Sequence, residues 1–182
     1  DDRLLASAGD DGSVMLWEIA TGDRIRRLEG SGCPVNAVAF SPNGALLAFG
    51  DDEGVVHLAD PATGERSRKL TAHEGPVYWV TFAPAGSPLA SAADDGTVAL
   101  WDVESGEELQ RFAPDGGAMN AAAFSPDGQL LATAGDDGAV YLRDVETGQD
   151  VHVLEGHQKA VNALAFSPDG SLLVSGSADK TV

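Results

Sequence analysis

The sequence predicts an all-β protein assembled from repeated units of four short antiparallel strands. Residues of one type recur every 42 positions, turn motifs occupy fixed places in each repeat, and no segment shows a sustained helical period of apolar residues. The period needs no insertion or deletion, and it is marked by two series: Phe40, Phe82, Phe124 and Phe166, and Gly12, Gly54, Gly96 and Gly138.

The first half of each repeat is defined by its turn chemistry. Val35–Phe40 is expected to form a first strand, because it is followed by the turn Ser41-Pro42-Asn43-Gly44. Leu46–Phe49 is expected to form the second strand. An acid–glycine pair then predicts a hairpin turn, with both of its residues at positive φ. This pair recurs as Asp11-Gly12, Glu53-Gly54, Asp95-Gly96 and Asp137-Gly138.

The second half supplies two further strands on either side of a Thr-Gly or Ser-Gly turn. Val14–Trp17 is expected to be a third strand and Arg24–Leu28 a fourth. Four short antiparallel strands in about 40–45 residues are typical of one blade of a β-propeller. The sequence therefore predicts a propeller of 42-residue repeats.

Two dipeptides in the repeat make the sequence similar to the WD-repeat β-propeller family. Trp17-Glu18 and Trp101-Asp102 stand at the family's Trp-Asp pair, and Ala72-His73 and Gly156-His157 stand at its Gly-His pair. The resemblance covers the whole chain. It implies a non-catalytic scaffold for protein–protein interaction that binds peptides or protein domains.

The period divides residues 1–182, a single partial propeller, into five pieces. We expect an incomplete blade at 1–30, complete blades at 31–72, 73–114 and 115–156, and an incomplete blade at 157–182. Both ends fall within a repeat, so we expect a segment of a longer propeller. An alternative is a homodimer in which the end pieces of two chains complete each other and close an eight-bladed ring.

Composition excludes several classes of function. Hydrophobic residues make up 43% and charged residues 22%, as in globular domains. The 11 Lys and Arg stand against 29 Asp and Glu, and the resulting charge of −18 repels nucleic-acid phosphates. Nucleic acid is therefore not an expected partner. No apolar run is long enough for a membrane helix, so a membrane is not an expected partner either. Cys33 cannot form an intrachain disulfide, and it leaves the compartment undetermined. We expect a cytoplasmic protein rather than a secreted one.

The resemblance assigns His73 to a buried hydrogen-bond set with Ser91, Asp95 and Trp101. A tryptophan only donates and a serine relays, so a histidine between Ser and Asp is held in one tautomer. The set therefore has a structural role. A hydrolase is not expected, because Ser91 lies within a predicted strand without a nucleophile-elbow sequence.

The other repeats depart from this set. Unit 31–72 cannot form it, because the four positions hold Ser31, Phe49, Glu53 and Ala59. Unit 115–156 keeps Thr133 and Asp137 but has Asp115 and Arg143 in place of His and Trp. The remaining histidines, His57 and His152, are predicted to be half-exposed bystanders. No cofactor is expected, and no metal site either, because the acidic turns lack the order of a calcium loop.

A second candidate site lies on the upper face, around the channel of the propeller implied by the resemblance. Like charges on one rim attract cationic segments, and the aromatic pair Tyr78-Trp79 could anchor a Lys- or Arg-bearing peptide. The alternative is that Trp79 fills space between blades and the acidic residues serve solubility. The candidate rim comprises Asp10, Asp52, Asp94, Asp136, Asn36, Tyr78, Trp79, Asn120 and Asn162.

Two other classes of function remain open. The first alternative to a scaffold is that the chain is the regulatory, sensory part of a larger signalling enzyme, such as a kinase or nucleotide hydrolase. A small ligand in the channel is the remaining alternative, because the alanines of the first strand at 121–123 leave space there. No catalytic set accompanies that space.

Overall fold

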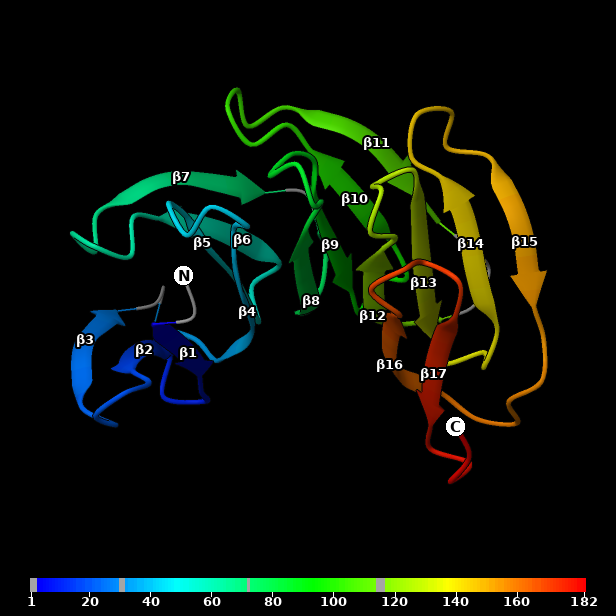
Figure 1. Ribbon diagram of the computed structural model, residues 1–182, viewed down its shortest axis with the longest axis horizontal. Helices are drawn as coiled ribbons and strands as arrows, with labels where there is room; N and C mark the ends of the chain where they lie inside the picture. The colour runs from blue at the N-terminus through cyan, green and yellow to red at the C-terminus, as the bar shows by residue number, and fades with distance from the viewer. Residues whose placement is uncertain (1–2, 30–31, 72, 114–116) are drawn as a thin grey trace.

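The computed structural model describes residues 3–29, 32–71, 73–113 and 117–182. These residues form an all-β structure of five antiparallel sheets, which stand side by side in a curved row (Figure 1). No helix in these ranges is long and apolar enough to cross a membrane.

Each sheet follows chain order. The first sheet has three strands, β1 (Leu4–Ala8), β2 (Ser13–Glu18) and β3 (Arg24–Glu29). The second has β4 (Val35–Phe40), β5 (Leu47–Asp51), β6 (Val55–Ala59) and β7 (Arg66–Thr71). The third has β8 (Val77–Phe82), β9 (Leu89–Ala93), β10 (Val98–Trp101) and β11 (Glu108–Phe112). The fourth has β12 (Met119–Phe124), β13 (Leu130–Gly135), β14 (Val140–Asp144) and β15 (Asp150–Leu154), and the last has β16 (Val161–Phe166) and β17 (Leu173–Ser177).

In the acid–glycine turns the glycine has the predicted positive φ, but the acid before it does not. Gly54 has φ +79°, but Glu53 does not adopt a positive φ. The Gly54 N–H donates to the Asp51 carbonyl at 3.2 Å, so the preceding residues form an ordinary turn and only the glycine adopts the left-handed conformation. Lys180 occupies the same place in the last repeat, and it is the one non-glycine residue with positive φ (74°) in the described ranges.

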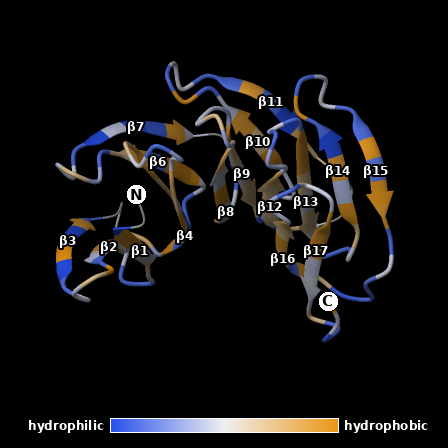
Figure 2. Cartoon of the chain, viewed as in Figure 1, coloured by the Kyte–Doolittle hydropathy of each residue, from blue (hydrophilic) through white to orange (hydrophobic). Residues whose placement is uncertain are grey.

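The hydrophobic core lies between neighbouring sheets. Val56 and Leu70 of the second sheet pack in one cluster with Val77 and Leu89 of the third, and all four are at most 2% exposed. Figure 2 shows mostly hydrophobic residues on the inner strands, whereas hydrophilic residues lie on the outer strands β3, β7, β11 and β15 and on many connecting loops. Face-to-face packing of this kind fixes the position of the loops at both ends of the strands.

A polar contact joins the outer strands to the next sheet, and we call it the inter-sheet clasp. The Arg26 guanidinium donates to the Ala62 carbonyl at 2.7 Å, Arg68 to the Ser105 carbonyl at 2.6 Å, and Gln110 to the Glu146 carbonyl at 3.0 Å. The acceptors lie in the turn between the third and fourth strands of the following sheet. In that turn Gly106 has φ +77°, and a Cβ there would lie 2.4 Å from Arg68 Cδ.

The last sheet covers its neighbour incompletely. Leu154 on β15 is 45% exposed, whereas its equivalents Leu28 and Leu70 are 6% and 2% exposed. The difference arises because the sheet that follows β15 has only the two strands β16 and β17 in this structure.

Candidate functional site

The structure brings the four residues of the predicted hydrogen-bond set together. His73 Nε2 lies 2.7 Å from Ser91 Oγ, and the Trp101 indole N–H donates to the same oxygen at 2.9 Å. His73 Nδ1 lies 3.3 Å from Asp95 Oδ2. Ser91 is fully buried on β9 and Trp101 is 3% exposed on β10, so the set ties the segment before β8 to two strands of its sheet.

Sequence reasoning missed a fifth member, Thr97. Its Oγ1 lies 2.9 Å from His73 Nδ1 and donates to Asp95 Oδ1 at 2.8 Å. The signal was present in the sequence, because a threonine two residues after the turn acid occurs only in the repeats that also carry the histidine, as Thr97 and Thr181.

The protonation state of the set follows from its burial. Burial lowers the pKa of His73, although the charge of Asp95 acts in the opposite direction. A neutral His73 accepts the Ser91 hydroxyl proton at Nε2 and donates its Nδ1 proton toward Asp95 and Thr97. Ser91 Oγ is thus enclosed and already accepts from Trp101, which is the arrangement of a structural bond and not of an exposed nucleophile.

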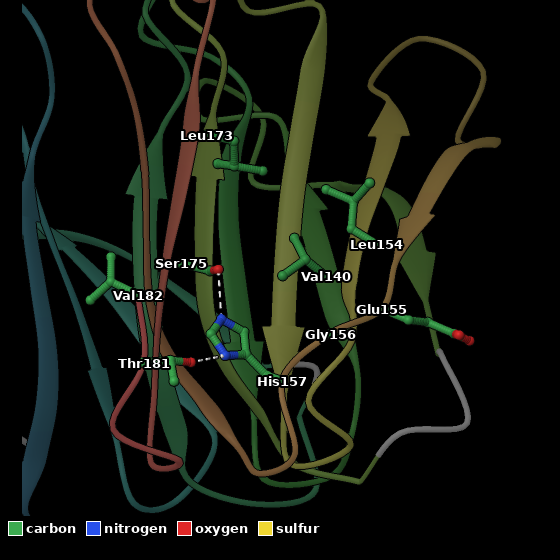
Figure 3. Close-up of a pocket in the computed structure, with 9 residues that line it drawn as sticks. All are labelled: Val140, Leu154, Glu155, Gly156, His157, Leu173, Ser175, Thr181 and Val182. Carbon is green, nitrogen blue, oxygen red and sulfur yellow. Dashed lines mark hydrogen bonds between the residues drawn. The ribbon is translucent and has the colours of Figure 1, made fainter.

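The last repeat contains the same histidine arrangement in an open setting. His157 lies between Ser175 Oγ, 2.8 Å from Nε2, and Thr181 Oγ1, 3.0 Å from Nδ1 (Figure 3). These side chains line a pocket together with the apolar residues Val140, Leu154 and Leu173. In the first sheet the other half of the set occurs, since the Trp17 indole donates to the exposed Ser7 hydroxyl at 2.9 Å.

The prediction that His57 is a half-exposed bystander is wrong. His57 on β6 is fully buried, its Nε2 lies 2.8 Å from Asp51 Oδ2, and its ring stacks on Phe49 at 4.9 Å between centroids. Asp51 Oδ1 also accepts the backbone N–H groups of Glu53 at 3.1 Å and Val55 at 3.0 Å. The second sheet therefore has a buried pair of its own where the His73-type set is missing.

The sequence does indicate a partner for His57, because the repeat has an unusual residue at Asp51. Asp51 stands where the other repeats have the small residues Gly9, Ala93, Gly135 and Ser177. A carboxylate at a position that is otherwise small and buried requires a partner, and a histidine on the facing strand supplies it. His152, in contrast, is exposed on β15.

The fourth sheet uses a different residue at the tryptophan position. The Arg143 guanidinium lies 4.7 Å from the centre of the Phe112 ring and pairs with Asp150. Within the described ranges, Thr133 Oγ1 and Arg143 Nη1 are buried without a hydrogen-bond partner. Three residues of the sequence argument, Ser31, Ala72 and Asp115, lie outside the described residues.

The candidate rim is built by one contact repeated in three sheets. The second residue of the inner strand donates to the acid that precedes the turn: Asn36 to Asp52 at 2.7 Å, Tyr78 to Asp94 at 2.9 Å, and Asn120 to Asp136 at 2.9 Å. Backbone bonds hold each acid in place, for example from the Asp94 N–H to the Pro76 carbonyl at 2.9 Å. All three acids remain exposed.

The negative charge of all three acids acts on Tyr78. Its hydrogen bond to Asp94 and its partial burial raise the pKa of the Tyr78 hydroxyl, and the charges of Asp52 and Asp136 raise it further. Trp79 points elsewhere, since it is half-buried and packs against the core between the third and fourth sheets. Asp10 and Asn162 are exposed. In the last repeat Ala178 occupies the position of the rim acid, so Asn162 has no carboxylate at that position to donate to.

A metal centre is not among the arrangements found in the described ranges. No group of three or more His, Cys, Asp or Glu is placed there to hold a metal ion. The candidate rim is an arrangement of carboxylates, amides and one phenol, which offers hydrogen-bond acceptors and negative charge to a ligand.

Comparison with known proteins gives matches along most of the chain. The family model described as WD domain, G-beta repeat, matches residues 1–18, 22–60, 64–102 and 148–182. The model described as the WD40 domain of anaphase-promoting complex subunit 4 matches residues 110–162. Over 43 residues the chain is 44% identical to the small ribosomal subunit protein RACK1 of Medicago sativa, a segment that covers 24% of this chain and 13% of that relative.

Proposed function

Because the chain belongs to the WD-repeat family, we propose that it is a non-catalytic scaffold that binds proteins, and that its acidic rim takes the basic segments of its partners. We define the acidic rim as Asp52, Asp94 and Asp136 with the donors Asn36, Tyr78 and Asn120. The observation that carries the proposal is the donor–carboxylate contact that recurs in three neighbouring sheets and leaves all three carboxylates exposed.

Electrostatics supports a cationic ligand. Each rim carboxylate receives one neutral side-chain donor, so its charge is oriented without being neutralised. Fixed like charges on one face raise the local concentration of cations and of Lys- or Arg-bearing segments. The exposed part of the Tyr78 ring offers a surface for the aliphatic stem and charge of such a residue.

Binding of a fluorescent peptide with alternating Lys and Ser residues tests this proposal. We expect Asp52→Asn/Asp94→Asn to weaken binding about fivefold or more, as lost charge pairs predict. The control Glu65→Gln/Glu107→Gln removes the same charge from exposed turns away from the rim, and it should leave affinity unchanged. Equal weakening by both double variants, or no measurable binding by the parent protein, would overturn the proposal.

A second proposal concerns self-association. The pocket beside His157 and the exposed Leu154 favour a homodimer in which the first sheet of one copy, with Trp17, covers the last sheet of the other. Light scattering across micromolar concentrations tests it. A monomer throughout that range would exclude the dimer and leave the rim proposal untouched.

A further inference from the structure

The positive charges of this acidic chain are unevenly placed. Six of the 11 Lys and Arg lie on two neighbouring outer strands, β3 and β7. We call these six residues the outer basic strip: Arg24, Arg26, Arg27, Arg66, Arg68 and Lys69. The strip lies on the outside of the row of sheets (Figure 1), on a different part of each sheet from the acidic rim.

The strip is not a general property of the outer strands. β3 carries three Arg and one Glu, and β7 carries two Arg and one Lys. At the same place in the next two sheets, β11 has one Arg and one Glu, and β15 has one Asp and no Lys or Arg. Charged residues on edge strands often serve to prevent aggregation, but β11 and β15 are equally edges and carry no net positive charge.

Part of this charge is not neutralised by ion pairs within the described ranges. Arg26 and Arg68 are held by backbone carbonyls, which orient a guanidinium but leave its charge in place. Arg27 faces Asp11 at 3.7 Å and Glu29 at 3.4 Å. Arg24 and Lys69 are exposed and form no ion pair in the part of the chain that the structure describes.

The backbone of β7 offers a second determinant. In the order β4-β5-β6-β7 this strand is the outer edge, so it is paired on one side only. Arg66, Ser67, Lys69 and Thr71 are exposed along it. An edge strand can accept one more strand through its main-chain groups, while alternate side chains select the sequence that binds.

We propose that the outer basic strip is a docking surface for an extended acidic segment of a partner protein, which adds to the edge of β7 as a further strand. Charge complementarity selects the occupant, because Glu or Asp at alternate positions would face the cations of β7 and its neighbour β3. The surface is distinct from the acidic rim and selects the opposite charge, so the two proposals fail independently.

The probe is a fluorescent twelve-residue peptide of alternating Glu and Thr, titrated with the whole chain. We expect saturable binding that weakens strongly between about 0.05 and 0.5 M NaCl, as screening predicts. Arg24→Gln/Lys69→Gln removes two cations that have no partner in the described structure, and we expect it to weaken binding about fivefold. The charge-matched control Lys159→Gln/Lys180→Gln should bind as the parent protein does.

Three outcomes would overturn the docking surface, and a fourth would overturn strand addition alone. The first three are no binding by the parent protein, equal loss in both double variants, and tighter binding of a single-stranded oligonucleotide than of the peptide. A peptide of equal charge with proline at every third position separates strand addition from simple charge attraction, because proline cannot complete the ladder. Equal affinity for both peptides would contradict addition to β7.

Discussion

Asp51 Oδ2 lies 2.8 Å from His57 Nε2, and both side chains are fully enclosed within the second sheet. The same carboxylate closes the following turn through the N–H groups of Glu53 and Val55. In the third sheet Asp95 closes the turn and a separate histidine reaches it from the preceding segment. Both sheets thus contain a buried histidine beside a turn carboxylate, but the residues come from different positions of the repeat.

The buried pair predicts strong coupling between its two residues. Asp51→Gly leaves His57 and two backbone N–H groups without an acceptor, so we expect a loss of about 3–5 kcal/mol in the free energy of unfolding. His57→Met leaves a buried carboxylate, with a similar penalty. The double variant has the residues of the first repeat, Gly9 and Met15, at these two positions. Urea unfolding should show that its loss in the free energy of unfolding is at least about 1 kcal/mol smaller than the sum of the losses in the two single variants. Additive losses would show that the pair is not coupled.

The same pair predicts a pH dependence of stability. Burial lowers the pKa of His57 below its ordinary value of 6.5, against the effect of Asp51 and with a further contribution from Arg66 and Lys69. Burial lowers that of His73 as well. The unfolded chain therefore binds protons that the folded chain does not, and stability is lost as pH falls below about 6.5.

Urea midpoints measured between pH 7.5 and 5.5 test this dependence. The slope contributed by each histidine is at most about 1.4 kcal/mol per pH unit. The turn carboxylates do not contribute in this range, because Asp60, Asp102 and Asp144 have pKa values lowered from 3.8 by hydrogen bonds to their turns. The slope should decrease in Asp51→Gly/His57→Met, and it should be unchanged in His152→Gln, whose side chain is exposed. A flat profile in the parent protein would contradict the prediction.

The equivalent serines of the first and third sheets provide a matched test of burial. Ser91 is fully buried between His73 and Trp101, whereas Ser7 is exposed and receives only the Trp17 indole. Ser91→Ala leaves two buried groups unsatisfied, so we expect a loss of about 2–4 kcal/mol. Ser7→Ala should cost less than about 1 kcal/mol, because water replaces the lost acceptor. Equal losses in thermal unfolding would mean that burial of the set does not matter.

The sequence predicted the strands well because one repeated pattern of apolar residues and turns specifies them. Val35–Phe40 was predicted to the residue, and β5 begins one residue after its expected start. Departures from the repeat were harder to interpret. Asp51 lies on β5 and bonds to His57 on the paired strand β6, so each residue explains the presence of the other only when the two are considered together. The inter-sheet clasp was not predicted either, because it joins residues about 37 positions apart whose proximity depends on how two sheets pack.

The clasp predicts that two equivalent glycines differ in their tolerance of a side chain. Gly22 and Gly106 have φ of +76° and +77°, so alanine at either should cost about 1 kcal/mol in backbone strain. A Cβ at Gly22 meets no atom within 4 Å, whereas at Gly106 it meets the Arg68 side chain, which holds the Ser105 and Glu104 carbonyls at 2.6 and 2.7 Å. Gly106→Ala should therefore cost about 1 kcal/mol more, from the displaced hydrogen bonds.

Removing the arginine isolates this additional cost. In an Arg68→Ala background nothing is left to displace, so Gly106→Ala should cost no more than Gly22→Ala does in the parent protein. Chemical denaturation of the four variants measures all of these differences. If Gly106→Ala and Gly22→Ala destabilise the parent equally, the Arg68 contact contributes nothing to holding the sheets together. A surplus cost that persists without Arg68 would place the conflict in the backbone of the turn instead.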